Sequence, residues 1–241
     1  MRNRYRQLLL SGGFIAAMSL SHAAIAGPVR DFERDLSNAY AHYRAALLSS
    51  NQSNKAATEA AIAAFGDAWS KQIAVHKATP PPHYADDTKW GETLDKVTSV
   101  IAKSKTEAGA GDLPKAHATL EAIRDLIGDL RLRNGTISYS DRVNIYHEHM
   151  EHVVTRTYGA DAEGIAKLRE DVAVLAFLAT DLERFKPAEL ATDDAFKQAL
   201  VALKTSVDTL QAAARAGETA KFDPLRKALK PTYSRFFIKF G

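Results

Sequence analysis

Apolar side chains recur every three or four residues along most of this chain, which is the spacing of one face of an α-helix. Strand-like alternation is rare, and Ala, Leu, Lys and Glu are abundant. Asp or Asn caps, early prolines and terminal glycines divide the pattern into segments. We therefore predict an all-α protein with helices at about residues 31–48, 55–77, 88–108, 112–134, 140–158, 161–186, 193–216 and 222–239.

The second half of this pattern repeats the first at an offset of 106 residues. Gly111–Lys115 lies over Gly217–Lys221, and apolar positions and breakers keep register without a gap over about 46 residues. Four apolar pairs share the offset: Trp90 and Phe196, Leu94 and Leu200, Val97 and Leu203, and Ile101 and Val207. Chance is the alternative, since amphipathic helices align whenever their turns do. We favour an up-and-down helical bundle of two pseudo-repeated four-helix units, 27–135 and 136–241, side by side or fused in one body.

Residues 1–26 have the pattern of a secretory signal peptide. Three arginines precede a mostly apolar stretch, and Ala24–Ala26 forms a small-residue cleavage site. No later segment approaches the roughly 20 apolar residues that a transmembrane helix needs. We expect a cleaved, soluble protein in the periplasm or secreted, spanning Gly27–Gly241.

Charge and cysteine content exclude several functions. Without the three arginines of residues 1–26, 29 basic residues stand against 29 acidic ones. This balance gives no reason to expect binding to nucleic acid or to anionic membranes. The chain has no cysteine, which excludes zinc fingers, iron–sulfur clusters, thiol catalysis and thioether-linked haem.

The run Tyr146–His152 is the richest in metal-ligand chemistry, with three imidazoles, two carboxylates and a thioether. On a helix, residues three and four apart share a face. His147 and Met150 then lie on a stripe that faces the core, with Glu151 beside them. His149 and His152 point to the opposite side, where we expect a solvated surface.

The preceding helix repeats the His-x-x-x-Glu spacing in His117 and Glu121, with Arg124 on the same stripe. The other half has Ala41, Arg44 and Ala45 in place of His147, Met150 and Glu151, and Asp223 and Lys227 in place of His117 and Glu121. These groups are therefore not required for packing in that half.

Facing helices with inward His and Glu build metal sites in bundles. We expect copper or iron, before zinc, at His147, Met150 and Glu151, with Glu121 or His117 nearby, for storage, transfer or sensing. Antiparallel pairing about a turn near Ile137 would put Arg124 level with Met150. It would also separate His117 from His147 by about 15 Å along the helix axis.

A metal-free scaffold is the main alternative. It would hold a small ligand or a partner helix in an interhelical pocket, and the same His and Glu side chains would form separate hydrogen bonds or face solvent. An enzyme is least favoured, because the chain has no Gly-rich phosphate loop, nucleophile elbow or triad. The oligomeric state stays open.

The four-helix units resemble the architecture of cytochrome b562 and cytochrome c′, which makes non-covalent haem a third hypothesis. The likeness is at the level of fold. The haem-attachment motif of cytochrome c′ is absent. Neither half has the b562 arrangement of a methionine on the first helix and a histidine on the last.

Overall fold

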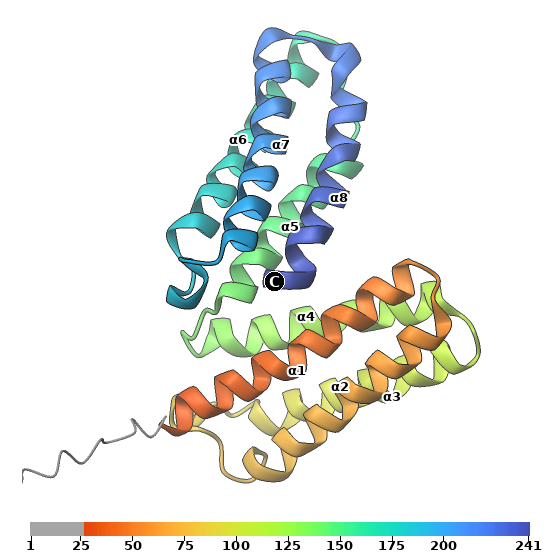
Figure 1. Ribbon diagram of the computed structural model, residues 1–241, viewed down its shortest axis with the longest axis vertical. Coiled ribbons are helices and arrows are strands. Elements are labelled where there is room, and N and C mark those ends of the chain that lie inside the picture. The colour runs from red at the N-terminus through yellow and green to blue at the C-terminus, as the bar shows by residue number, and fades with distance from the viewer. Residues whose placement is uncertain (1–26) are drawn as a thin grey trace, which may run out of the picture.

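The computed structural model describes residues 27–241, and all regular secondary structure in that range is helical. Residues 1–26, where we expect the signal peptide, lie outside the described part. The α-helices are α1 (Pro28–Asn51), α2 (Lys55–His76), α3 (Trp90–Gly109), α4 (Leu113–Arg133), α5 (Tyr139–Thr155), α6 (Ala162–Arg184), α7 (Asp194–Ala216) and α8 (Phe222–Phe240) (Figure 1). The all-α prediction is confirmed, and each bound lies within a few residues of the one read from the sequence.

Short polar side chains start five of these helices. Asn54, Asp112, Asp161 and Asp193 each accept a hydrogen bond from the backbone N–H three residues later. Ser138 forms a reciprocal capping box with Asp141 at the start of α5. Each cap satisfies a backbone donor that has no partner within the helix.

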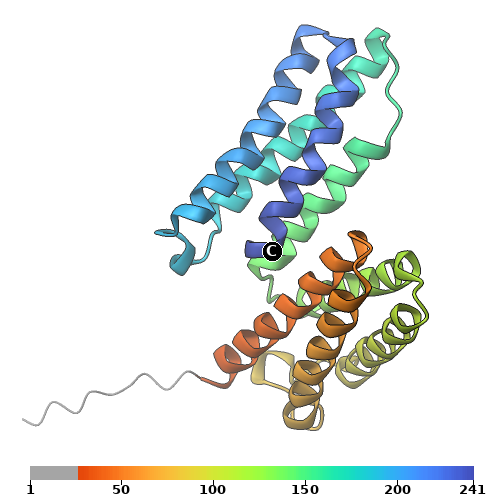
Figure 2. The ribbon, with the colours of Figure 1, turned by 45° about the vertical axis from the view of Figure 1, so that its right-hand side comes forward.

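The helices pack in two groups of four. Within α1–α4 and within α5–α8, each helix packs against its neighbours in sequence, and the first packs against the fourth. Figures 1 and 2 show the two groups as separate stacks of ribbon that meet at an angle. Across the junction, α1 and α8 make the main helix–helix contact.

Structural features of the two helix groups match at the same offset as the sequence repeat. All four apolar pairs at the offset of 106 residues are buried in the core. The 3-10 turn η1 (Pro82–Tyr84) precedes α3, and η2 (Ala188–Leu190) precedes α7 at the same offset. Gly111 and Gly217, also equivalent, both have positive φ, at 83° and 71°, which favours glycine.

The expected antiparallel pairing of α4 with α5 is wrong. The two helices belong to different groups and diverge after the link 134–138 (Figure 1). Buried Arg131, near the end of α4, bonds to Ser138 at 2.9 Å and to Asp141 at 3.4 Å, at the start of α5. It also bonds to Glu33 of α1 at 3.2 Å. This network orients the start of α5 relative to the first group.

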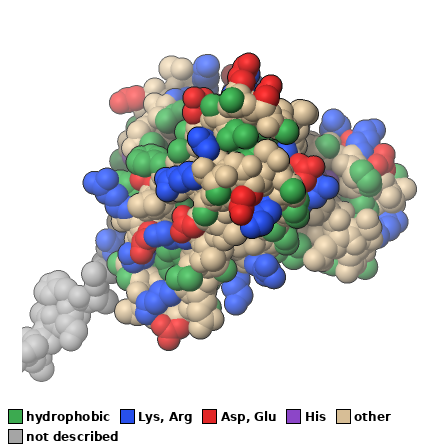
Figure 3. Space-filling view, turned by 90° about the horizontal axis from the view of Figure 1, so that it is seen from above, with side chains coloured by type: hydrophobic (Ala, Val, Ile, Leu, Met, Phe, Trp, Pro, Cys, Tyr) green, Lys and Arg blue, Asp and Glu red, His purple; other side chains and the backbone are tan. Residues whose placement is uncertain are grey.

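The outer surface carries both signs of charge. Figure 3 shows Lys and Arg interspersed with Asp and Glu over the face seen from above, with small apolar areas between them. None of the helices in residues 27–241 combines the length and the apolarity needed to cross a bilayer.

Candidate functional site

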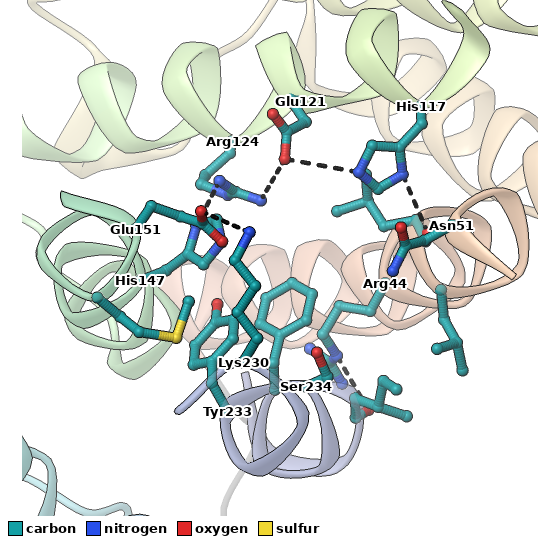
Figure 4. Close-up of a pocket in the computed structure, with 15 residues that line it drawn as sticks. Arg44, Asn51, His117, Glu121, Arg124, His147, Glu151, Lys230, Tyr233 and Ser234 are labelled. Carbon is teal, nitrogen blue, oxygen red and sulfur yellow. Dashed lines mark hydrogen bonds and ion pairs between the residues drawn. The ribbon is translucent and has the colours of Figure 1, made fainter. Parts of the chain in front are cut away.

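A pocket of about 430 Å³ lies where the two helix groups meet. Its walls come from α1 and α4 of the first group and from α5 and α8 of the second (Figure 4). All five residues singled out in the sequence line it: His117, Glu121, His147, Met150 and Glu151. The junction therefore brings together side chains from both predicted stripes.

A chain of polar contacts runs along this wall. His117 Nε2 lies 3.8 Å from Glu121 Oε1, which lies 3.5 Å from Arg124 Nη2. Arg124 Nη1 lies 2.8 Å from His147 Nδ1. His147 Nε2 lies 3.6 Å from Glu151 Oε1. Glu151 Oε2 ends the chain with an ion pair to Lys230 Nζ at 2.8 Å. Basic and acidic groups thus alternate along much of the wall.

The contact between Arg124 and His147 determines which nitrogen of the imidazole carries the proton. A guanidinium is always protonated and only donates, so Nδ1 of His147 accepts the hydrogen bond. The ring proton then sits on Nε2, which faces Glu151. The ring also stacks on Tyr233, with centroids 4.7 Å apart and planes 19° from parallel. Both nitrogens and one ring face of His147 are therefore engaged within the protein.

His117 is held at the other end of the pocket. Its Nδ1 lies 3.2 Å from the carbonyl oxygen of Leu47 and 2.9 Å from Ser50 Oγ, both on α1. The carbonyl only accepts, so Nδ1 carries the proton that it receives. This bond turns Nε2 towards Glu121.

Met150 and Glu151 complete the predicted stripe. Met150 is buried at 1% exposure and packs at the border between core and pocket. Hydrogen bonding to His147, together with the ion pair to Lys230, outweighs partial burial and lowers the pKa of Glu151 to about 2. Glu151 is therefore ionised at neutral pH.

These contacts bear on the predicted metal site. Within residues 27–241, no three His, Asp or Glu side chains come together as a group that would hold an ion. Arg124 and Lys230 lie among the predicted ligands instead. The His and Glu side chains pair with each other and with these cations along the wall, and metal binding stays a prediction.

His149 and His152 lie on the other side of α5, as the helical spacing predicts. They line a separate hollow of about 260 Å³ with Asp171 and Val174. His152 Nε2 lies 3.3 Å from Asp171 Oδ2, and His149 Nδ1 lies 3.2 Å from the carbonyl oxygen of Ile145. The histidine-rich run is thus divided between two faces.

Among the pocket residues that the sequence did not predict are Arg44 of α1, and Lys230 and Tyr233 of α8. Arg44 donates to the carbonyl oxygens of Ile238 and Gly241 at the end of α8, and so joins the two groups. The internal sequence repeat could have indicated one of them, Lys230. Arg124 and Lys230 are equivalent at the offset of 106 residues, and both cations face this pocket.

Acidification tests the role of Glu151. A carboxyl whose pKa is lower in the folded state stabilises the fold above its ordinary pKa, 4.5 here, and loses that contribution as the pH falls towards 2. Glu151→Gln should therefore show a smaller loss of unfolding free energy than the parent between about pH 5 and about pH 2. Urea denaturation across this range measures the difference.

Glu148→Gln is the matched control for this measurement. Glu148 is exposed on α5 and lines the separate hollow with His149 and His152, away from Lys230. Its replacement should alter the acid dependence of the parent much less than Glu151→Gln does. Equal acid dependence in the parent and in Glu151→Gln would contradict the assignment.

Comparison of the chain with protein-family models, with curated proteins and with solved structures finds no match.

Proposed function

We propose that this protein binds a small organic ligand in the pocket between its two helix groups. The contact between Arg124 and His147 carries the proposal. The imidazole nitrogen that faces α4 accepts a hydrogen bond from a guanidinium, so it has no lone pair to offer to a metal ion. An ion in the centre of the wall would also meet the charges of Arg124 and Lys230, which repel it.

The size of the pocket and the apolar side of its lining support an organic ligand. Small-molecule sites have volumes of about 300–1,000 Å³, an apolar lining and a few convergent polar groups. Leu47, Leu48, Phe237 and Ile238 provide an apolar side from α1 and α8. The alternating charges on α4 and α5 provide the polar side. A ligand with an apolar body and one polar group matches this division.

The proposed setting is outside the cytoplasm. It rests on the signal-peptide pattern of residues 1–26. In this setting the protein would carry or sense its ligand. Fractionation of cells that express the full chain, with N-terminal sequencing of the product, tests cleavage after Ala26.

A neutral fluorescent probe tests the binding proposal. N-phenyl-1-naphthylamine becomes fluorescent in apolar surroundings and carries no charge. We expect saturable binding to the mature chain, and we expect Ser234→Trp to abolish it, because Ser234 lines the pocket and an indole there occupies ligand space. Ser99→Trp is the matched control, since Ser99 is exposed on α3, away from the pocket. Absence of saturable binding, or equal binding by both variants, would contradict the proposal.

The copper or iron hypothesis stays a prediction that a parallel titration tests. The purified mature chain and a His147→Ala/Met150→Ala variant are titrated with Cu²⁺ and with Fe²⁺. Stoichiometric binding that the variant loses would favour the metal and contradict the organic ligand. Added haem tests the third hypothesis, since a bound haem gives a Soret band.

A further inference from the structure

Two buried hydrogen-bonding groups at the pocket have no partner among the described residues: the hydroxyl of Tyr233 and Nε of Arg124. Tyr233 is 5% exposed. In Figure 4 its hydroxyl is directed towards the side of the pocket where His147 and Arg124 lie. Burial raises the pKa of Tyr233 well above its ordinary value, so the hydroxyl keeps its proton and can donate.

An unpartnered buried hydroxyl destabilises a fold, and most buried polar groups in proteins have partners. A phenylalanine at position 233 would keep the stacking on His147 and avoid this penalty. Tyr233 lines the pocket and its hydroxyl is directed to the side where Arg124 lies, so an acceptor bound there would supply the missing partner (Figure 4). Since its proton is the group on offer, the ligand should bring an acceptor.

The net charge of the pocket lining also favours a ligand that brings an acceptor. Arg44, Arg124 and Lys230 bring three positive charges, against the two carboxylates of Glu121 and Glu151. These five side chains together carry one positive charge in excess. The contacts of Glu121 are long, at 3.5 and 3.8 Å, and its side chain is 44% exposed. Glu121 therefore leaves donors of Arg124 available to another acceptor.

We propose that the ligand is an organic monoanion, a carboxylic acid with an apolar body, a step that rests on the proposed function of the pocket. Its carboxylate lies between Arg124, Lys230 and Tyr233, and accepts hydrogen bonds from all three. Its apolar part lies against Leu47 and Phe237. One negative charge balances the wall, whereas a cation adds to the excess and a dianion reverses it.

Competition experiments on the mature chain test the charge of the ligand. They measure how well molecules of different charge displace the neutral probe. Benzoate, benzamide and phenyl phosphate share the aromatic body and differ in the polar group. Benzoate should displace the probe at a concentration about tenfold lower than benzamide, because hydrogen bonds to charged groups are the stronger ones. It should also act at a lower concentration than phenyl phosphate. Added salt should weaken benzoate and leave benzamide unchanged.

Two tyrosine variants test the position of the carboxylate. Tyr233→Phe keeps the ring and removes the unpartnered hydroxyl, so it should weaken benzoate about tenfold and leave the probe unchanged. Tyr146→Phe is the matched control. Tyr146 is fully buried, stacks on Tyr233 and also has an unpartnered hydroxyl, but it does not line the pocket. Its replacement should leave the affinity for benzoate as it is.

The outcomes separate the two proposals. Equal displacement by benzoate and benzamide, or tighter binding of phenyl phosphate, would overturn the monoanion while probe binding upholds the pocket. The same holds if Tyr233→Phe and Tyr146→Phe bind benzoate alike. Failure of the probe to bind the parent would overturn the proposed function itself.

Discussion

Replacing Arg131 with methionine is expected to lower the free energy of unfolding by about 3 kcal/mol, because Glu33 and Asp141 then lose the cation that they share. Arg131 is 3% exposed, and its guanidinium bridges α1, α4 and the capping box of α5. Methionine keeps an unbranched apolar side chain in its place. Urea denaturation at neutral pH measures the change.

Arg34→Met is the matched control for this prediction. Arg34 forms ion pairs with Asp31 and Asp35 on the surface of α1, where its side chain is 56% exposed. Exposed ion pairs contribute little to stability, so this variant should stay close to the parent. If both variants lost the same free energy, the Arg131 network would not hold the junction as described.

The Arg131 network also shows which feature of the fold local sequence patterns do not determine, namely the direction of α5. Helix positions follow from apolar spacing and from caps such as Asp112 and Asp193, and these signals act within a few residues. The direction of α5 depends on Arg131 and Glu33, which lie 98 residues apart in the chain. A turn centred near Ile137 therefore predicts a hairpin, whereas the capping box and the buried arginine direct α5 away from α4.

The candidate site also has one part that local sequence predicts and one part that depends on how the helices pack. The stripe of His147, Met150 and Glu151 follows from helical spacing on one element. Lys230 and Tyr233 join it only because α8 packs near α5 and α1, which no local pattern specifies. The repeat offers a partial route to Lys230 through its equivalence with Arg124. The hydroxyl of Tyr233 gives no sequence signal, since a buried tyrosine in a core is ordinary.

Replacing Trp90 with alanine is expected to destabilise the protein by about 3–5 kcal/mol, the usual range for loss of a large buried aromatic side chain. Trp90 is 3% exposed and stacks on Tyr84, with ring centroids 5.0 Å apart. Its ring centroid lies 5.6 Å from that of Phe32. Its Nε1 also donates to the carbonyl oxygen of His76 at 3.1 Å. Because these partners all belong to the first helix group, hydrogen exchange should accelerate mainly in α1–α4.

Phe196→Ala is the counterpart at the equivalent position of the repeat. Phe196 is 1% exposed and packs against Tyr139, Phe236 and Phe240 of the second group. A similar loss of stability should appear with faster hydrogen exchange mainly in α5–α8. Buried side chains run continuously across the junction, but helix packing lies mostly within each group, so local opening should follow the groups. Uniform acceleration over residues 28–240 in both variants would instead mean that the two groups unfold as a single cooperative unit.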